Sequence, residues 1–173
     1  MDDEAVVAVQ IGRPLRSAAA AARRCHLGLP VVILVPPVLD DGTPFPTRYW
    51  LCCPLALRRV GRLESAGGAA AMERRAAADP AFGLRLEEAH QRYAAERDAA
   101  LVGEPDARPA GGVGGARGGV KCLHAHYADH AAGHDNPVGE AVAPWVEPLD
   151  CTEPCVVEAA GRTVTNPRWR EPR

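Results

Sequence analysis

The histidine-rich segment VKCLHAHYADHAAGHDNPVG (120–139) holds four of the six histidines of the chain and one of its six cysteines. On a helix, side chains four residues apart share a face, and two histidines at that spacing can bind one metal ion. The pattern favours a metal site, and the competing interpretation is a helix whose histidines face solvent. The residues at successive steps of four are Cys122, His126, His130 and His134.

Cys122 and His124 offer a different pair of ligands. Two residues apart on a helix, their side chains would face away from each other. The glycine-rich residues before them favour a non-helical start to this helix. From such a start, both side chains could reach one metal ion.

Other cysteines stand where strands are expected to end. Cys25 precedes a Gly-Leu-Pro turn and Cys53 precedes Pro54, so two strand ends could bring these thiols to Cys122. Three thiolates and one imidazole would form a closed, structural zinc site, whereas three ligands and a water would form a catalytic one. The spacing leaves both arrangements open.

Two further cysteines, Cys151 and Cys155, have a spacing that zinc-ligand pairs can have. The alternative is a pair of unused thiols in a flexible tail. Cys52 alternates with Cys53 to the opposite face of its strand, where we expect a small core residue.

Three polar residues in HQRYAAER (90–97) are spaced for one helix face. His90, Tyr93 and Arg97 could bind a phosphate or a carboxylate, and with Lys121 they are the candidate catalytic residues. The alternative is a half-buried tyrosine with solvated neighbours.

A short antiparallel sheet is expected to position the N-terminal thiols. VVILV (31–35) is a run of aliphatic residues that ends at two prolines, and TRYWLCC (47–53) is expected to pair with it across an Asp-Gly turn. Residues 18–24 are a candidate third strand. Aromatic residues make up only 5% of the chain, so we expect a small core.

Helices are expected to follow the sheet. Asp79-Pro80 combines a capping residue with a proline at the first helical position, and Asn136-Pro137 does the same. Glu64, at the end of an earlier helix, is expected to be a surface carboxylate. The expected helical ranges are 55–66, 69–78, 80–101, 120–133 and part of 136–150.

Together these elements predict an α+β fold, in which a short antiparallel sheet of two or three strands near the N-terminus packs against three to five helices. Residues 1–150 are expected to form a single domain with a flexible Gly/Pro-rich loop at 103–119. Residues 151–173 are expected to form a partly ordered C-terminal tail.

Charge and hydropathy exclude several classes of protein. The formal net charge of −2 gives no pull toward nucleic acid. The chain lacks a run of about 18 apolar residues, and its acidic start is unlike a signal peptide, so no membrane association is expected. We therefore expect a cytoplasmic protein, whose thiols are free, catalytic or metal-bound rather than paired in disulfides.

Four segments, in this order and spacing, resemble one protein family. The chain is identified as a member of the bacterial family known as domain of unknown function 501, over roughly residues 5–140. The PFPT and KCLH stretches are the specific part of the resemblance. The segments are DGTPFPTRYWLCCP (41–54), RLESAGG (62–68), ERD (96–98) and VKCLHAHYADHAAGHDNPVG (120–139).

The resemblance implies a set of metal ligands. The family pattern has Cys at position 25, Cys or His at 53 and Cys-Leu-His at 122–124, and a Cys-to-His exchange suits a ligand. It implies zinc bound by Cys25, Cys53, Cys122 and His124, with the later histidines at the surface or beside the site. The family often has a second histidine where this chain has Asp129, which could still act as a ligand. The alternative ligands are His126, Asp129, His130, Cys151 and Cys155.

Two classes of function remain. The first is a zinc-stabilised module with a binding or regulatory role, whose partner would be a protein or a small anionic ligand. The second is a metal-dependent, hydrolase-like enzyme with an open metal position near His90, Tyr93, Arg97 and Lys121. Four protein ligands would favour the module, whereas three ligands and a water in a cleft would favour the enzyme.

Overall fold

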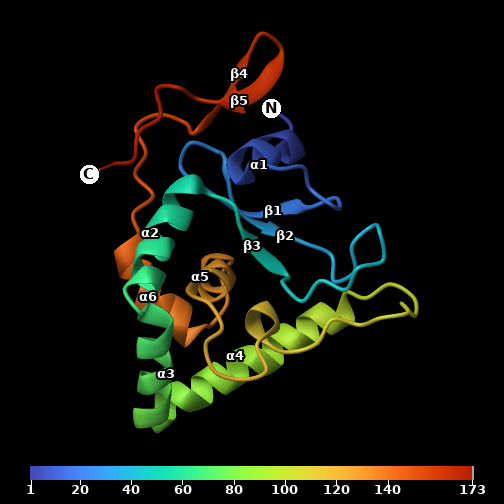
Figure 1. The fold of residues 1–173 in the computed structure, drawn as a ribbon, viewed down its shortest axis with the longest axis vertical. Coiled ribbons are helices and arrows are strands. Elements are labelled where there is room, and N and C mark those ends of the chain that lie inside the picture. Colours follow the sequence, from blue (N-terminus) through green and yellow to red (C-terminus); the bar gives the residue numbers. More distant parts are fainter. Residues whose placement is uncertain (173) are drawn as a thin grey trace.

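The computed structural model describes residues 1–172. Within that range six α-helices accompany a three-stranded antiparallel sheet near the N-terminus and a two-stranded hairpin near the C-terminus (Figure 1). The predicted α+β class is confirmed. The strands of the first sheet, in the order β1-β2-β3, are β1 (Ala20–Arg24), β2 (Pro30–Leu34) and β3 (Tyr49–Leu51).

The central strand β2 is buried on both faces, as expected for an aliphatic run without polar alternation. Val32 faces the main core, which includes residues of α2, α4, α5 and α6, whereas Ile33 belongs to a smaller second core. Ile33 is paired with Ala21 of β1 and Trp50 of β3. Within the candidate third strand (18–24), residues 20–24 therefore join the sheet.

The helices begin where their capping residues predict. The Asp79 side chain accepts hydrogen bonds from the first-turn amides of α4, and Asn136 accepts one from the amide of Gly139 in α6. The helices are α1 (Asp3–Ile11), α2 (Pro54–Ser65), α3 (Gly68–Ala78), α4 (Pro80–Ala99), α5 (Leu123–Ala131) and α6 (Pro137–Val146), with a 3₁₀ turn, η1 (Val113–Gly115).

The histidine-rich helix α5 is the central helix of the fold. It lies between the sheet, α2, α4 and α6 (Figure 1), and its face toward the core includes a completely buried His126 and Asp129. The histidines after His124 were expected at the surface or beside the site, and burial excludes the surface position for His126. Alanine is frequent in α5, and its small side chain lets neighbouring elements approach closely enough to bury the polar residues between them.

The C-terminal segment has regular structure. Strands β4 (Val156–Ala159) and β5 (Arg162–Thr165) form an antiparallel hairpin that contacts α1. Cys155, Val156 and Trp169 belong to the main core, so apolar burial holds the segment that we expected to be a partly ordered tail. Within residues 1–172, no helix is both long enough and apolar enough to cross a membrane.

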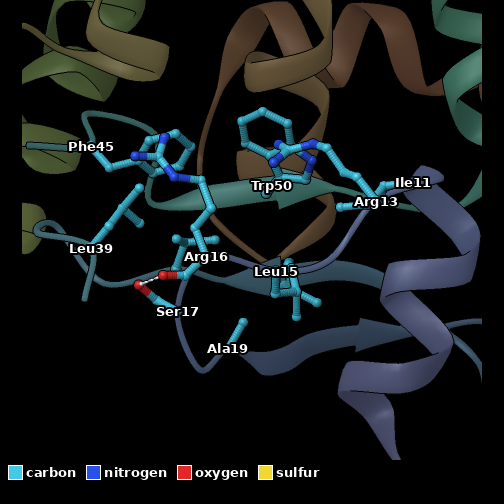
Figure 2. Close-up of a pocket in the computed structure, with 11 residues that line it drawn as sticks. Ile11, Arg13, Leu15, Arg16, Ser17, Ala19, Leu39, Phe45 and Trp50 are labelled. Carbon is cyan, nitrogen blue, oxygen red and sulfur yellow. Dashed lines mark hydrogen bonds between the residues drawn. The ribbon is translucent and has the colours of Figure 1, made fainter. Parts of the chain in front are cut away.

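The second core is covered by loops and by α1, which contributes Val7 and Ile11. A small pocket of about 50 Å³ opens there, between the end of α1 and β3 (Figure 2). The guanidinium of Arg13 lies 5.6 Å from the centre of the Trp50 ring, and that of Arg16 pairs with Asp41 at 2.5 Å. The apolar stems of the two arginines thus cover part of this face while their charges stay near water.

Gly139 is required by the contact between α5 and α6. A Cβ at this position would lie 2.3 Å from the Cβ of His130 and 2.4 Å from the carbonyl oxygen of His126. We predict that Gly139→Ala lowers the free energy of unfolding by about 3 kcal/mol, because backbone must shift to admit the methyl group. Urea unfolding followed by circular dichroism measures the change.

Gly61→Ala in α2 is the matched control. A Cβ at Gly61 meets nothing within 4 Å, so this variant should gain about 0.5–1 kcal/mol from the lower flexibility of its unfolded chain. Equal effects of the two substitutions would contradict the proposed tight contact at Gly139.

Candidate functional site

The predicted ligands Cys122 and His124 lie at the start of α5. Cys122 has an extended backbone (φ −158°, ψ 146°), which confirms the non-helical start. His124 Nδ1 lies 3.0 Å from Glu64 Oε2, and Glu64 Oε1 accepts the backbone N–H of Leu123 at 2.5 Å. Glu64, expected as a surface carboxylate, is partly exposed and also caps α5 from the end of α2.

The other predicted thiols, Cys25 and Cys53, lie elsewhere, beside the C-terminal pair. Cys53 and Cys155 are part of the main core, and Cys25 and Cys151 pack against it. Cys155 is within electrostatic range of Cys25 and Cys151, as Cys53 is of Cys151 and Cys155. We call these four residues the thiol cluster.

Two hydrogen-bond donors point at sulfurs of the thiol cluster. Trp169 Nε1 donates to Cys151 Sγ at 3.4 Å, and Gln10 Nε2 donates to Cys155 Sγ at 3.6 Å. Burial raises the pKa of Cys53 to about 11 and also raises that of Cys155, and neighbouring thiols add to both effects. Both shifts keep these two thiols protonated at neutral pH.

The structure does not bring the implied quartet of Cys25, Cys53, Cys122 and His124 together. Within residues 1–172, no three His, Cys, Asp or Glu side chains share a position from which they could hold a metal ion. All six cysteines are free. Zinc binding therefore stays a prediction.

An open cleft of about 710 Å³ borders the thiol cluster. It lies between the residues that follow β1 and the segment that follows α6. Cys25 lines it from the first of these segments and Cys151 from the second. His26 Nε2 lies 2.9 Å from the carbonyl oxygen of Cys151, so the two segments are also joined by a hydrogen bond.

Three of the four catalytic candidates share a face of α4, as their spacing predicted, and that face is buried. His90 accepts the N–H of Val113 at Nδ1 (3.0 Å), and its Nε2 lies 2.9 Å from the carbonyl oxygen of Gly119. Arg97 donates to the carbonyl of Gly111. These contacts fasten the second half of the glycine-rich loop to α4.

The remaining two candidates also bind backbone groups. The hydroxyl of Tyr93 accepts the N–H groups of Arg48 at 2.6 Å and Tyr49 at 3.3 Å, which joins α4 to β3. Lys121 Nζ donates to the carbonyl of Gly114 at 3.2 Å. The four candidates thus position the loop and the strand, and their predicted catalytic role is not tested by this arrangement.

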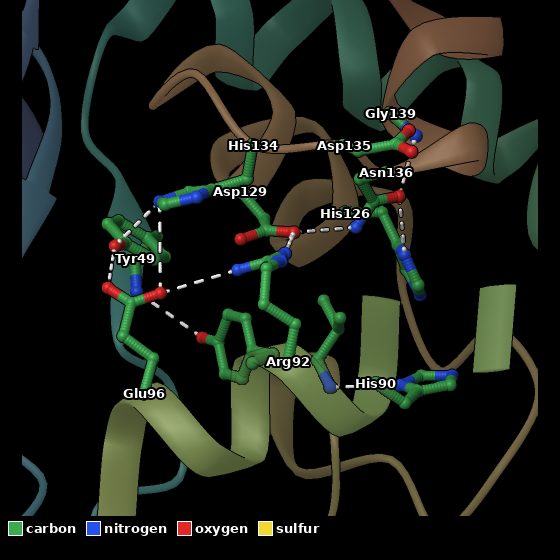
Figure 3. Close-up of polar contacts among 12 residues, drawn as sticks. Tyr49, His90, Arg92, Glu96, His126, Asp129, His134, Asp135, Asn136 and Gly139 are labelled. Atoms are coloured by element: carbon green, nitrogen blue, oxygen red, sulfur yellow. Dashed lines mark hydrogen bonds and ion pairs between the residues drawn. The ribbon is translucent and has the colours of Figure 1, made fainter. Parts of the chain in front are cut away.

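A buried polar network lies between α4, α5 and α6 (Figure 3). The completely buried Asp129 accepts at Oδ2 from Arg92 Nη2 (2.5 Å) and from Asn136 Nδ2 (2.9 Å). Asn136 Oδ1 in turn accepts from the N–H of Gly139 (3.0 Å) and lies 3.1 Å from His126 Nδ1. One chain of hydrogen bonds therefore runs from the Arg92 guanidinium to the His126 ring.

This network fixes the protonation of His126. Because Asn136 Oδ1 can only accept, His126 carries its hydrogen on Nδ1 and has a lone pair on Nε2. Burial lowers the pKa of His126 to about 4, so the ring is neutral, and it is turned toward His90, with ring centres 5.6 Å apart (Figure 3). Among residues 1–172, the Nε2 atom of His126 and the Oδ1 atom of Asp129 are buried without a hydrogen-bond partner.

The charge of Asp129 is balanced locally. Burial raises its pKa, and the hydrogen bonds and charge from Asn136 and Arg92 oppose that rise. As a metal ligand, Asp129 could offer only Oδ1, since Oδ2 already accepts two hydrogen bonds. His130, the other alternative ligand on this helix, is partly exposed and lies against Gly139 instead.

The network continues to the sheet through residues that the spacing argument missed. Arg92 Nη1 donates to Glu96 Oε2 at 3.3 Å, and Glu96 accepts a short hydrogen bond from the Tyr49 hydroxyl. His134 Nε2 lies 2.7 Å from the same hydroxyl. Arg92 and Glu96 are four residues apart on α4, a spacing typical of ion pairs. That spacing is the sequence signal from which this pair could have been predicted.

These features define a small α+β protein with a buried polar network and a separate thiol cluster. The chain matches the family described as Protein of unknown function (DUF501) over residues 21–144, and it belongs to that family. The resemblance seen in the sequence is thereby confirmed. The matched range includes Cys25, Cys53 and Cys122 but ends before Cys151. The chain matches no curated protein and no solved structure.

The neutral, buried His126 should make the fold sensitive to acid. In the unfolded chain, His126 is protonated below its ordinary pKa of about 6.5. In the folded protein, His126 is protonated only below about pH 4. The free energy of unfolding should therefore fall by about 2 kcal/mol between pH 7 and pH 5. Urea unfolding at a series of pH values measures this slope.

His126→Asn removes the titrating group and retains a donor toward Asn136. The variant should be less stable at pH 7, but its stability should depend less on pH between 7 and 5. His130→Asn, at the partly exposed position, should keep the slope of the original chain. If the His126→Asn slope equals that of the original chain, the buried neutral state is wrong.

Proposed function

We propose that this chain is a zinc-stabilised module whose metal is held by Cys25, Cys53, Cys151 and Cys155. The observation that carries the proposal is the gathering of these thiols, from three separate segments, at one edge of the main core. Four thiolates are a donor set typical of structural zinc. Cys151 and Cys155 thus take the places that the resemblance gave to Cys122 and His124.

Hydrogen-bond donors around the sulfurs oppose the burial that keeps Cys53 and Cys155 protonated, and metal binding would release those protons. The N–H donors of Trp169 and Gln10 resemble the outer hydrogen bonds that orient metal-bound ligands. Cys53 stands at the N-terminus of α2, where backbone amides of Leu55 and Ala56 favour the thiolate. Coordination requires the sulfurs to turn toward a common point, because they do not share one in the structure.

A metal here would tie the C-terminal segment to the rest of the fold. The segment from Cys151 to Cys155 lies between α6 and the β4–β5 hairpin, and Cys25 and Cys53 follow strands of the sheet. A chain with few aromatic residues gains stability from such a tie. The site suits a reducing compartment such as the cytoplasm, in which the module would have a binding or regulatory role.

The cleft beside the thiol cluster favours a second candidate function. Three thiolates with an open position toward this cleft would make a metal-dependent, hydrolase-like enzyme. Arg23 and Arg24 line the cleft, although they pair with Glu147 and Asp3. Zinc X-ray absorption separates the two functions, since four sulfur neighbours favour the module and three sulfurs with one oxygen favour the enzyme.

We predict that untagged protein carries about one zinc ion per chain. Removing the metal with a strong chelator should lower the melting temperature by roughly 10 °C, because the metal binds the folded chain alone. Cys151→Ser and Cys155→Ser should each reduce the zinc content severely. Elemental analysis after gel filtration and thermal unfolding are the two measurements.

Cys122→Ser and His124→Ala are the matched controls and should keep both zinc and melting temperature. If the controls lose zinc and Cys151→Ser retains it, the metal is held instead by the quartet that the resemblance implies. Protein without stoichiometric metal, and indifferent to chelator, would remove the proposal altogether.

A further inference from the structure

A surface pocket lies beside the Lys121–His124 segment, away from the thiol cluster. It has a volume of about 330 Å³, at the lower end of the range for small-molecule sites. Its walls come from β3, α2, η1 and the start of α5. Most of its surface is apolar and includes Trp50, Leu51 and Leu57.

Lys121 is the only lysine of the chain and lines this pocket. Its ammonium donates one hydrogen bond to Gly114, which leaves two N–H donors for a ligand. His124, on the same wall, has its Nδ1 against Glu64 and therefore has Nε2 left for a ligand.

The charges around the pocket select a single negative charge. Glu64 is not part of the pocket wall, and its carboxylate is already engaged by the first amides of α5 and by His124. The Lys121 ammonium is thus the one full charge that the pocket wall presents within residues 1–172. A doubly charged phosphate ester would bring an uncompensated charge near Glu64, whereas one carboxylate would not.

We propose that this pocket binds a small molecule with an apolar body and one carboxylate. The carboxylate lies against Lys121 and His124, and the apolar body covers Trp50, Leu51 and Leu57. The site is independent of the proposed zinc module, since it shares no residue with the thiol cluster.

Calorimetry with three matched probes tests the pocket. 4-Phenylbutyrate, 4-phenylbutanol and 4-phenylbutylamine share one apolar body and differ in the charge of the head group. We expect 4-phenylbutyrate to bind about fivefold more tightly than the alcohol, and the amine to bind most weakly. Failure of 4-phenylbutyrate to bind at 10 mM, or equal binding of acid and amine, would overturn the proposal.

Variants locate the binding. Lys121→Met, at an exposed position, should reduce the affinity for 4-phenylbutyrate to that for the alcohol and leave the alcohol unchanged. Leu57→Trp should fill the pocket and weaken both probes, whereas Arg74→Met, at an exposed position of α3 outside the pocket wall, should have no effect. If Lys121→Met binds the acid as tightly as the original chain, the assignment is wrong. Zinc content measured on the same samples keeps this result separate from the test of the thiol cluster.

Discussion

The helices of this protein are arranged around a carboxylate that water does not reach. Asp129 is completely buried, and its charge is balanced by Arg92 of α4 and the amide of Asn136. Taking a carboxylate out of water costs several kcal/mol unless it is paired and hydrogen-bonded. Since α5 contributes the acid and α4 the guanidinium, neither helix can slide along the other without separating the pair. The same pair therefore specifies the relative position of the two helices, which small alanine side chains alone would specify weakly.

Asn136 extends this constraint to the third helix. Its Oδ1 caps α6 through Gly139 and accepts from His126, while its Nδ2 binds Asp129. The residue that determines where α6 begins is thus also the residue that determines which nitrogen of His126 carries hydrogen. Gly139 belongs to the same arrangement, because any larger residue would push α6 away from the Asn136 contact. The same residue, Asn136, therefore both caps α6 and stabilises the buried charge of Asp129.

Local signals predicted the elements well and the contacts between them poorly. The aliphatic run of β2 and the capping pair at Asp79-Pro80 encode their structure within a few residues, so both could be identified from the sequence. The spacing of His90, Tyr93 and Arg97 also predicted a shared face correctly. Periodicity identifies a face but not what covers it, and the backbone groups that bind these side chains lie 14 to 45 residues away in the sequence. The gathering of Cys151 and Cys155 with Cys25 depends on the path of the chain after α6, which no local pattern encodes.

The glycine-rich loop explains why residues with catalytic chemistry occupy structural positions. A Cβ at Gly112 would lie 2.3 Å from His90 Nδ1, and one at Gly114 would lie 2.8 Å from the Cβ of Ala125. The glycines of this loop have no side chains with which to hold it, so the backbone there is bound by side chains from outside the loop. The side chains of His90, Arg97 and Lys121 carry N–H donors and are long enough to reach the loop. They form hydrogen bonds with its backbone carbonyls. Of these, Lys121 alone keeps donors to spare and faces a pocket, because an ammonium has three N–H groups and the loop uses one. An anion in that pocket can share the ammonium with Gly114, so ligand binding and attachment of the loop do not compete.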